Sequence, residues 1–332
     1  MSSTVEHGGA TSAAVSPERW RVRRPLHHRL LEILIHVLAA TAIFAIALIF
    51  IFVVKETIPL FYSEEVLAEV TLAKMWLAQQ WPGYDEAVHV WQPVSEIPKY
   101  GLWPLLAGSL KVTVVAVAIA APLGVGSALY VAELARPRLR EVLKPAIELL
   151  AAIPSVVLGF FALIVMATWV QDLFDLDSRL SAFLAGLALS FALIPSIFTM
   201  CEEAFRAVPR SYVEASTALG ARRVQTLLRV VVPAASPGIA AALALGFGRA
   251  IGETMIVLMA SGNAAILSAS IGDSTRTLPA TIAAELAEVV FGGAHYTVLF
   301  FIGTILFALT FLVNLAGGLA IDRMRARLGG RA

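Results

Sequence analysis

The chain has 332 residues, of which 58% are hydrophobic and only 15% are charged, and its mean hydropathy is +0.80. Soluble domains carry more charge than this, so the composition indicates a polytopic membrane protein. The formal net charge of +1 gives no sign of nucleic-acid binding, and the single Cys201 excludes an intrachain disulfide framework and a cysteine-based metal site.

The first 30 residues are polar and basic. Residues 1–16 are rich in Ser, Thr, Ala and Gly without periodicity, which predicts a disordered tail. Residues 31–55 form an apolar run that is longer than a signal-peptide core and is not followed by a small-residue cleavage site. We therefore expect a first transmembrane helix that is retained in the mature protein.

Six apolar stretches are each long enough for a membrane-spanning helix, which needs roughly 20 residues. They cover residues 33–54, 105–132, 147–170, 180–200, 237–262 and 296–320. The fifth is the least uniform because it carries Arg249 and Glu253. The pattern predicts an all-α polytopic membrane protein with six transmembrane helices, of which residues 105–322 form the core.

Basic residues fall on one side of this arrangement. They precede the first span, follow the second and the fourth, and fill the tail at residues 323–332: Arg19, Arg21, Arg23, Arg24, Arg29, Arg136, Arg138, Arg140, Lys144, Arg206, Arg210, Arg222, Arg223, Arg229, Arg323, Arg325, Arg327 and Arg331. The positive-inside rule makes this side cytoplasmic. Both termini are then inside, and the loop of residues 56–104, in which acidic residues outnumber Lys, lies outside.

Arg249 and Glu253 are four residues apart, so on a continuous helix they share one face. A charge at the centre of a membrane helix costs about 2.5 to 3.5 kcal/mol on insertion scales. One interpretation is a mutual ion pair that only neutralises this cost. The interpretation that we favour places both residues in a solute path, where a fixed cation attracts an anion and the carboxylate weakens its hold enough for release.

Residues 201–233 form a polar segment between the fourth and fifth spans, on the cytoplasmic side. Pro209 starts a turn, Ser211 is a plausible N-cap with Glu214 as its capping-box partner, and Gly220 ends the helix. A second helix is expected over residues 222–232, up to Pro233. Two short helices around a glycine turn make a protruding surface suited to a socket on another protein.

The same segment carries a sequence signature. Glu214-Ala215-Ser216 is followed after three residues by Gly220 and after nine more by Val230-Val231-Val232-Pro233. This spacing, in residues 203–233, resembles the EAA loop of prokaryotic ABC-importer permeases. Ser216 stands where the signature has a second Ala, which is a change between small residues.

Four further stretches narrow the resemblance to the C-type (PstC-type) permeases of phosphate-specific ABC importers. They are residues 100–110 (YGLWPLLAGSL), 148–161 (ELLAAIPSVVLGFF), 248–259 (GRAIGETMIVLM) and 276–296 (RTLPATIAAELAEVVFGGAHY). The long acidic outer loop and the Ala-His295-Tyr296 start of the last span favour the C type over the similar A type.

The resemblance implies a type I ABC-importer permease fold in a prokaryotic plasma (inner) membrane. It implies a PstA-type permease partner in the lipid bilayer, a PstB-type ATPase dimer that binds ATP and Mg²⁺, and an external PstS-type phosphate-binding protein. Ser211, Glu214, Ala215, Ser216, Gly220 and Pro233 correspond to the ATPase-coupling region, and Arg249 and Glu253 to charged positions of the phosphate path. The chain has no phosphate-binding loop ending in Lys-Ser or Lys-Thr, so we expect no enzyme activity, no catalytic residue and no cofactor or metal of its own.

Other functions remain open at this point. The chain resembles the A-type permease less closely, and one Arg suits phosphate, sulfate or molybdate equally, so phosphate depends on the resemblance. An ion-coupled secondary transporter would use Arg249 and Glu253 as its coupling pair, but no inverted repeat is visible and the cytoplasmic segment has no role there. A membrane receptor would dock a signalling protein on that segment. Co-purification of an ATPase pair separates the importer from both.

Overall fold

The structure is a computed structural model that describes residues 26–329. The expected disordered tail at residues 1–16 therefore lies outside the described residues. The chain forms two compact units, residues 1–51 and residues 52–332. Helix α1 (Leu26–Thr57) makes up the described part of the first unit and continues into the second. Its side chains along residues 30–51 are exposed and, apart from Glu32, His36 and Thr41, apolar, as in a helix surrounded by lipid.

In the described part of the second unit, the regular elements are helices apart from one small hairpin. The outer loop holds α2 (Pro59–Tyr62), α3 (Glu64–Glu69), α4 (Leu72–Trp76), β1 (Trp91–Gln92) and β2 (Lys99–Tyr100). The core holds α5 (Trp103–Leu129), η1 (Tyr130–Leu134), α6 (Pro137–Ala151), α7 (Ser155–Phe161), η2 (Ala162–Met166), α8 (Ala167–Phe174), α9 (Ala182–Arg206), α10 (Arg210–Ala218), α11 (Arg223–Thr226), η3 (Leu227–Val231), α12 (Val232–Ile251), α13 (Met255–Ala260), α14 (Leu278–Glu285) and α15 (Ala294–Gly329). The segments η1, η2 and η3 are single π-helical turns.

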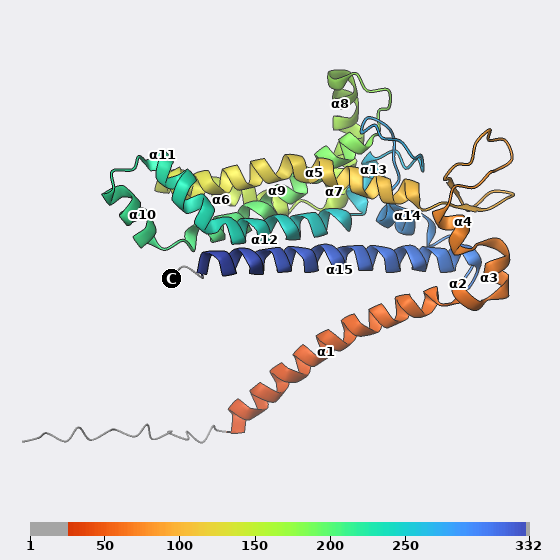
Figure 1. The fold of residues 1–332 in the computed structure, drawn as a ribbon, viewed down its shortest axis with the longest axis horizontal. Helices are drawn as coiled ribbons and strands as arrows, with labels where there is room; N and C mark the ends of the chain where they lie inside the picture. The colour runs from red at the N-terminus through yellow and green to blue at the C-terminus, as the bar shows by residue number, and fades with distance from the viewer. Residues whose placement is uncertain (1–25, 330–332) are drawn as a thin grey trace, which may run out of the picture. The chain divides into compact units, whose positions relative to one another are not determined.

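Helices α5, α9, α12 and α15 run side by side through the second unit (Figure 1). Small residues let α5 and α9 approach closely, as is common between membrane helices. A Cβ atom at Gly186 of α9 would lie 2.5 Å from Val115 Cγ1, and one at Gly124 of α5 would lie 2.8 Å from Ile197 Cγ2. The buried core of the unit lies mainly along this contact.

Six helices among the described residues are long and apolar enough to cross a membrane, as the sequence predicts. Two boundaries differ from expectation. The third span covers residues 155–174 instead of 147–170, because the chain is not helical at Pro154 and the preceding α6 is a separate amphipathic helix. The fifth span covers residues 223–251 instead of 237–262, because α12 stops at Gly252.

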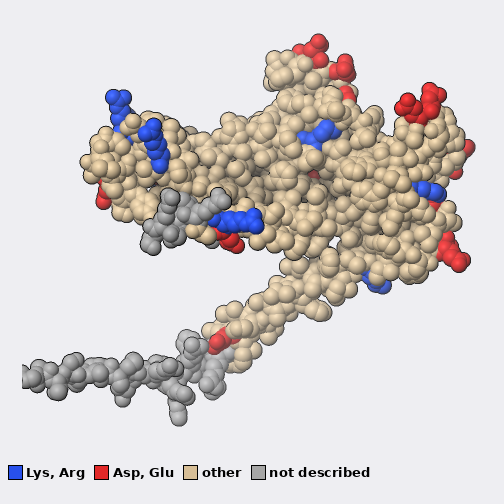
Figure 2. All heavy atoms as spheres, in the orientation of Figure 1, with Lys and Arg blue, Asp and Glu red and all other residues tan. Residues whose placement is uncertain are grey.

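The charges of the second unit separate along these helices. Figure 2 shows Lys and Arg side chains over the end formed by α10 and α11, and Asp and Glu side chains over α8 and the outer loop. The C-terminal end of α15 lies toward the same end of the second unit as α10 and α11 (Figure 1). This separation agrees with a cytoplasmic α10–α11 end under the positive-inside rule.

We predict that Gly124→Ala lowers the free energy of unfolding by about 1 to 3 kcal/mol, because the added methyl group overlaps Ile197 in a packed interface. Gly126→Ala is the matched control. It lies two residues along the same helix, where an added Cβ meets no atom within 4 Å. Thermal unfolding of the detergent-solubilised chain measures both, and equal melting temperatures would contradict the packing argument.

Candidate functional site

Residues 209–228 form a protruding unit between α9 and α12, which we call the knob. Its first helix, α10, ends at a left-handed Gly220 with φ +80°. The Gly220 N–H donates to the Thr217 carbonyl at 2.9 Å, and the Ala221 N–H donates to the Ser216 carbonyl at 3.2 Å. These two bonds form a Schellman cap, which requires a residue that accepts positive φ. The prediction that Gly220 ends the helix is therefore confirmed.

The N-cap prediction for Ser211 is wrong. Pro209 occupies the N-cap position, Ser211 lies inside the first turn, and no side chain caps α10. Pro209, with its extended ψ, starts the helix two residues before the predicted N-cap. The Gln225 side chain instead caps the second helix, where its Oε1 accepts the Arg222 N–H at 2.9 Å.

Glu214 and Ala215 lie on exposed positions of α10. Glu214 lines a cavity of about 540 Å³ between the knob and the cytoplasmic ends of η1, α6 and α9. Arg140, Arg206 and Arg210 line the same cavity. The acid of the EAA signature thus faces a basic recess at the base of the knob.

The second helix does not stop at Pro233. Residues 223–251 form one helix that runs from the knob into the membrane, and Pro233 lies in the first turn of α12. The π turn η3 precedes the proline, and the Val232 N–H donates to the Leu227 carbonyl five residues earlier. This wider turn shifts the hydrogen-bond register just where Pro233 has no N–H to offer.

Two sets of polar contacts hold the knob in place. The Ser216 hydroxyl lies 3.0 Å from the Thr226 hydroxyl, so Ser216 joins the two short helices. From α11, Arg223 Nη2 donates to the Glu133 carbonyl at 2.5 Å, and from α6, Arg140 Nε donates to the Val131 carbonyl at 2.9 Å. Both arginines cap the last carbonyls of the second span, and Arg223 ties it to the knob whereas Arg140 ties it to α6.

Arg249 and Glu253 lie elsewhere, at the break between α12 and α13. Arg249 is exposed in the last turn of α12, and its Nη1 donates to Ser196 Oγ, near the middle of α9, at 2.5 Å. Glu253 lies beyond the helix end and its Oε1 accepts the Thr254 N–H at 3.2 Å. The expectation of one shared helix face is wrong, because α12 ends at Gly252.

No ion pair joins Arg249 to Glu253, both of which the structure describes. The interpretation as a neutralising pair therefore loses its geometric basis. Arg249 is instead exposed at an interrupted helix, opposite the middle of α9.

Sequence reasoning missed two carboxylate clusters. Glu202 of α9 is fully buried, and it lies 2.9 Å from Lys144 Nζ of α6 and 2.7 Å from Arg206 Nε. Its signal is an acid four residues before a basic one at the end of an apolar run. This cluster fastens the amphipathic α6 to α9.

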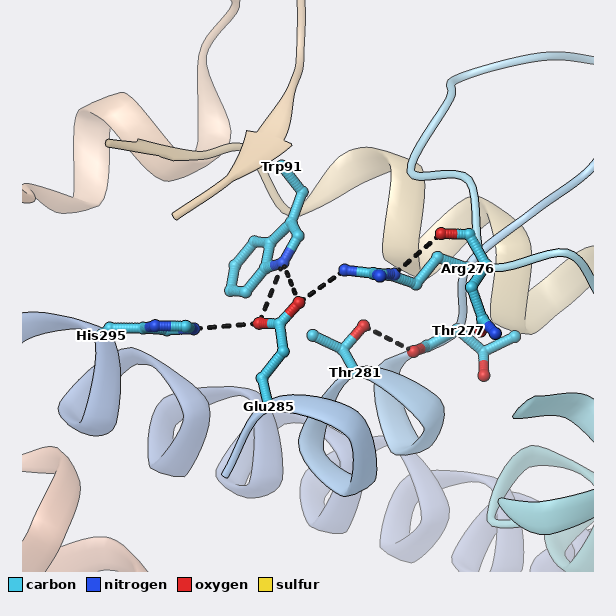
Figure 3. Close-up of polar contacts among 7 residues, drawn as sticks. Trp91, Arg276, Thr277, Thr281, Glu285 and His295 are labelled. Atoms are coloured by element: carbon cyan, nitrogen blue, oxygen red, sulfur yellow. Dashed lines mark hydrogen bonds and ion pairs between the residues drawn. The ribbon is translucent and has the colours of Figure 1, made fainter. Parts of the chain in front are cut away.

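The second cluster surrounds Glu285 at the end of α14 (Figure 3). Glu285 pairs with Arg276 Nη1 at 2.5 Å and with His295 Nε2 at 2.9 Å. The Trp91 indole N–H lies 3.1 and 3.2 Å from its two oxygens. No local spacing predicts this cluster, because its members come from four separate segments.

The fold and the knob together are those of a membrane-embedded transport subunit, and the family comparison agrees. Residues 120–326 match the family described as binding-protein-dependent transport system inner membrane component. This match covers more than half of the chain, so the chain belongs to that family. It is a multi-pass protein of the bacterial inner membrane.

Its curated relatives are permeases. The chain is 37% identical over 222 residues to the probable ABC transporter permease protein YqgH of Bacillus subtilis, covering 67% of this chain and 72% of the relative. It is 33% identical over 258 residues to the phosphate transport system permease protein PstC of Mesorhizobium japonicum, covering 72% and 78%. The PstC protein of Pasteurella multocida is 32% identical over the same length, covering 72% and 79%.

Solved structures support the fold. An inward-facing MetNI methionine ABC transporter matches 68% of this chain and 94% of its own chain, with a TM-score of 0.51 and 22% identity. A bacterial alginate ABC transporter, in complex with an alginate pentasaccharide-bound periplasmic protein, matches 88% and 94%, with a TM-score of 0.54 and 14% identity. The predicted type I ABC-importer permease fold is thereby confirmed.

We predict that Ser216→Ala loosens the knob, because it removes the hydroxyl partner of the buried Thr226. One such hydrogen bond is worth about 1 kcal/mol, so amide hydrogen exchange in α10 should speed up about fivefold. Thr217→Ala is the control, since the Thr217 hydroxyl bonds only to carbonyls of its own helix. Unchanged exchange in Ser216→Ala would show that this bond does not hold the two helices together.

Proposed function

We propose that this chain is the C-type permease subunit of an ATP-driven importer of inorganic phosphate. The observation that carries the proposal is that one continuous helix, residues 223–251, begins in the knob and ends at the exposed Arg249. The proposed coupling region in the knob and the candidate anion site at Arg249 thus lie on the same helix. The relatives named as phosphate transport permeases support phosphate as the cargo.

The knob has the surface of a docking element. Its exposed apolar side chains are Tyr212, Leu219, Val224 and Leu228, and Leu219 is 90% exposed at the helix end. Exposed apolar groups clustered on a small projection favour a protein partner. In this proposal the partner is one subunit of an ATPase dimer, which binds ATP and Mg²⁺ and receives the knob in a groove.

The remaining partners follow from the family. A second permease of the A type completes the translocation path, and an external phosphate-binding protein delivers the anion. Closure of the ATPase dimer on ATP moves both knobs, and the permease pair turns from inward-open to outward-open. The knob must make different contacts in the two states, because a contact that is equal in both shifts no equilibrium.

Arg249 suits the role of a transient anion site. Its positive charge attracts the anion, and its one described partner, the Ser196 hydroxyl, is neutral, so the charge is not cancelled by contact. Glu253 lies four residues further along and weakens the field. Weak binding is what conduction requires, because a tightly held anion does not leave.

The knob generates one prediction. Gly220→Leu should leave the protein in the membrane and abolish phosphate uptake. A Cβ atom at this position meets no atom of this chain within 4 Å, so the added bulk projects toward the groove that the proposal assigns to the ATPase, and the strain at φ +80° is matched by the control below. Glu214→Lys should have the same effect, because it reverses the charge beside the basic recess.

The controls separate coupling from strain and charge. Gly292→Leu introduces the same strain at φ +78° in open space between α14 and α15, and Glu203→Lys reverses an exposed charge of α9 outside the knob. Both should transport normally. Normal uptake by Gly220→Leu would refute the coupling role.

Arg249 generates a second prediction. Arg249→Gln should reduce labelled-phosphate uptake by about tenfold or more, which corresponds to about 1.4 kcal/mol, and should spare co-purification of the ATPase. Ser196→Ala should be milder, because it removes the contact and keeps the charge. Wild-type uptake by Arg249→Gln would eliminate the path role. Sulfate as competitor in the same assay tests the cargo, since equal competition would favour a general oxyanion importer.

A further inference from the structure

The outer loop ends in a small hairpin that cannot be stable by itself. Strands β1 and β2 pair antiparallel through only two residue pairs, Trp91 with Tyr100 and Gln92 with Lys99. Isolated two-stranded hairpins are marginal in water even when they are longer. This hairpin therefore depends on what its base contacts.

The base is firmly anchored. The side chains of Trp91 and Tyr100 are buried and their rings meet edge to face, with centroids 5.8 Å apart. The Trp91 indole donates to Glu285, which also binds Arg276 and His295, so α14, α15 and the segment before α14 all hold the hairpin (Figure 3).

The phenol of Tyr100 adds a further bond. Burial and the neighbouring Glu69 raise the pKa of Tyr100, so the phenol stays protonated and donates to Glu69 of α3. The hairpin base is thereby joined to the short helices of the outer loop as well.

The tip of the hairpin, in contrast, points apolar groups at water. Val94 is 89% exposed and Ile97 is 48% exposed. The tip is nevertheless ordered, since the Ser95 hydroxyl donates to the Gln92 carbonyl at 3.0 Å and to the Ile97 carbonyl at 2.5 Å. A single exposed valine needs no explanation, but here a rigid support presents it.

Hollows flank the hairpin on the same surface. Tyr84, residues 87–92 and residues 264–267 line a cavity of about 580 Å³, and Ile266 and Leu267 are exposed in its wall. A second cavity of about 490 Å³ lies beside residues 91–95, where Arg276 is paired with Glu285. Around the hairpin the exposed acids Asp85, Glu86 and Glu96 outnumber the one lysine, Lys99 of β2. We call residues 84–97 with residues 264–267 the outer docking surface.

We propose that the outer docking surface receives the external binding protein of this transporter through an apolar patch that Lys and Arg residues surround. This inference rests on the proposed function and names the surface for one of its partners. The three acidic residues favour a basic partner patch and disfavour anionic lipid headgroups. Because the hairpin is anchored at its base, its tip is already held in place before a partner binds, which lowers the entropy cost of binding.

The test uses the complete transporter in lipid nanodiscs, with ATP hydrolysis measured while the phosphate-loaded binding protein of the same system is titrated. Val94→Asp should raise the half-stimulating concentration about tenfold and keep the maximal rate, because it places a charge in an apolar contact. Glu96→Lys should also raise it, and added salt should weaken stimulation of the unmodified complex.

Val290→Asp is the matched control, since Val290 is 81% exposed between α14 and α15 and lies outside the outer docking surface. An unchanged half-stimulating concentration in Val94→Asp, or an equal rise in Val290→Asp, would overturn the proposal. Cross-linking from Val94→Cys should capture the binding protein, and capture of a second copy of this chain would also overturn it.

Two further results keep the inference separate from the proposed function. Trp91→Phe keeps a smaller aromatic ring and removes the N–H that binds Glu285, so it should raise the half-stimulating concentration less than Val94→Asp does. Suppose the unmodified complex takes up phosphate and is stimulated by the binding protein, and Val94→Asp has the same half-stimulating concentration as the unmodified complex. Then only the docking inference fails. If the unmodified complex takes up no phosphate, the proposed function fails.

Discussion

A peptide group that loses its helical hydrogen bond inside hydrocarbon must find another partner in the protein, and this requirement governs where the helices of this chain are interrupted. The end of the second span is capped by Arg140 and Arg223, and the register shift before Pro233 is absorbed by a π turn. After α12, some peptide groups still form local hydrogen bonds, including the bond from the Glu253 N–H to the Ala250 carbonyl three residues earlier. The knob and the exposed Arg249 both lie at such interruptions.

Charge pairing divides the ionised side chains into two kinds. Glu202 and Glu285 each bind two basic groups that reach them from different segments, so they hold helices and loops together. Arg249 instead donates to a neutral hydroxyl and is exposed. Buried ions need oppositely charged or hydrogen-bonding partners. A cation that is to bind a passing anion must instead not be neutralised by a carboxylate of its own protein.

The sequence predicted the number of spans and the glycine cap because each depends on local composition. Gly220 is a clear case, since positive φ favours glycine. The start of the third span was missed, because a hydropathy window merges the apolar end of α6 with α7 across Pro154. The start of α10 was missed at Ser211, because Pro209 competes as the first capping residue.

The Glu285 cluster was out of reach for a different reason. Trp91, Arg276, Glu285 and His295 meet only after the outer loop has folded onto α14 and α15, and no periodicity in the chain connects them. The end of α12 between Arg249 and Glu253 could not be predicted either. Glycine is common inside membrane helices, so Gly252 gives no definite stop signal.

The continuous helix of residues 223–251 has a mechanical consequence. At 1.5 Å per residue, about 25 Å of α12 separates Val232 from Arg249. The π turn η3 interrupts the regular hydrogen bonding just before α12, which is a common place for a hinge. A tilt of α12 by about 5° around Val232 displaces the backbone of Arg249 by about 2 Å, so a small adjustment at the knob end changes the distance between the guanidinium and Ser196.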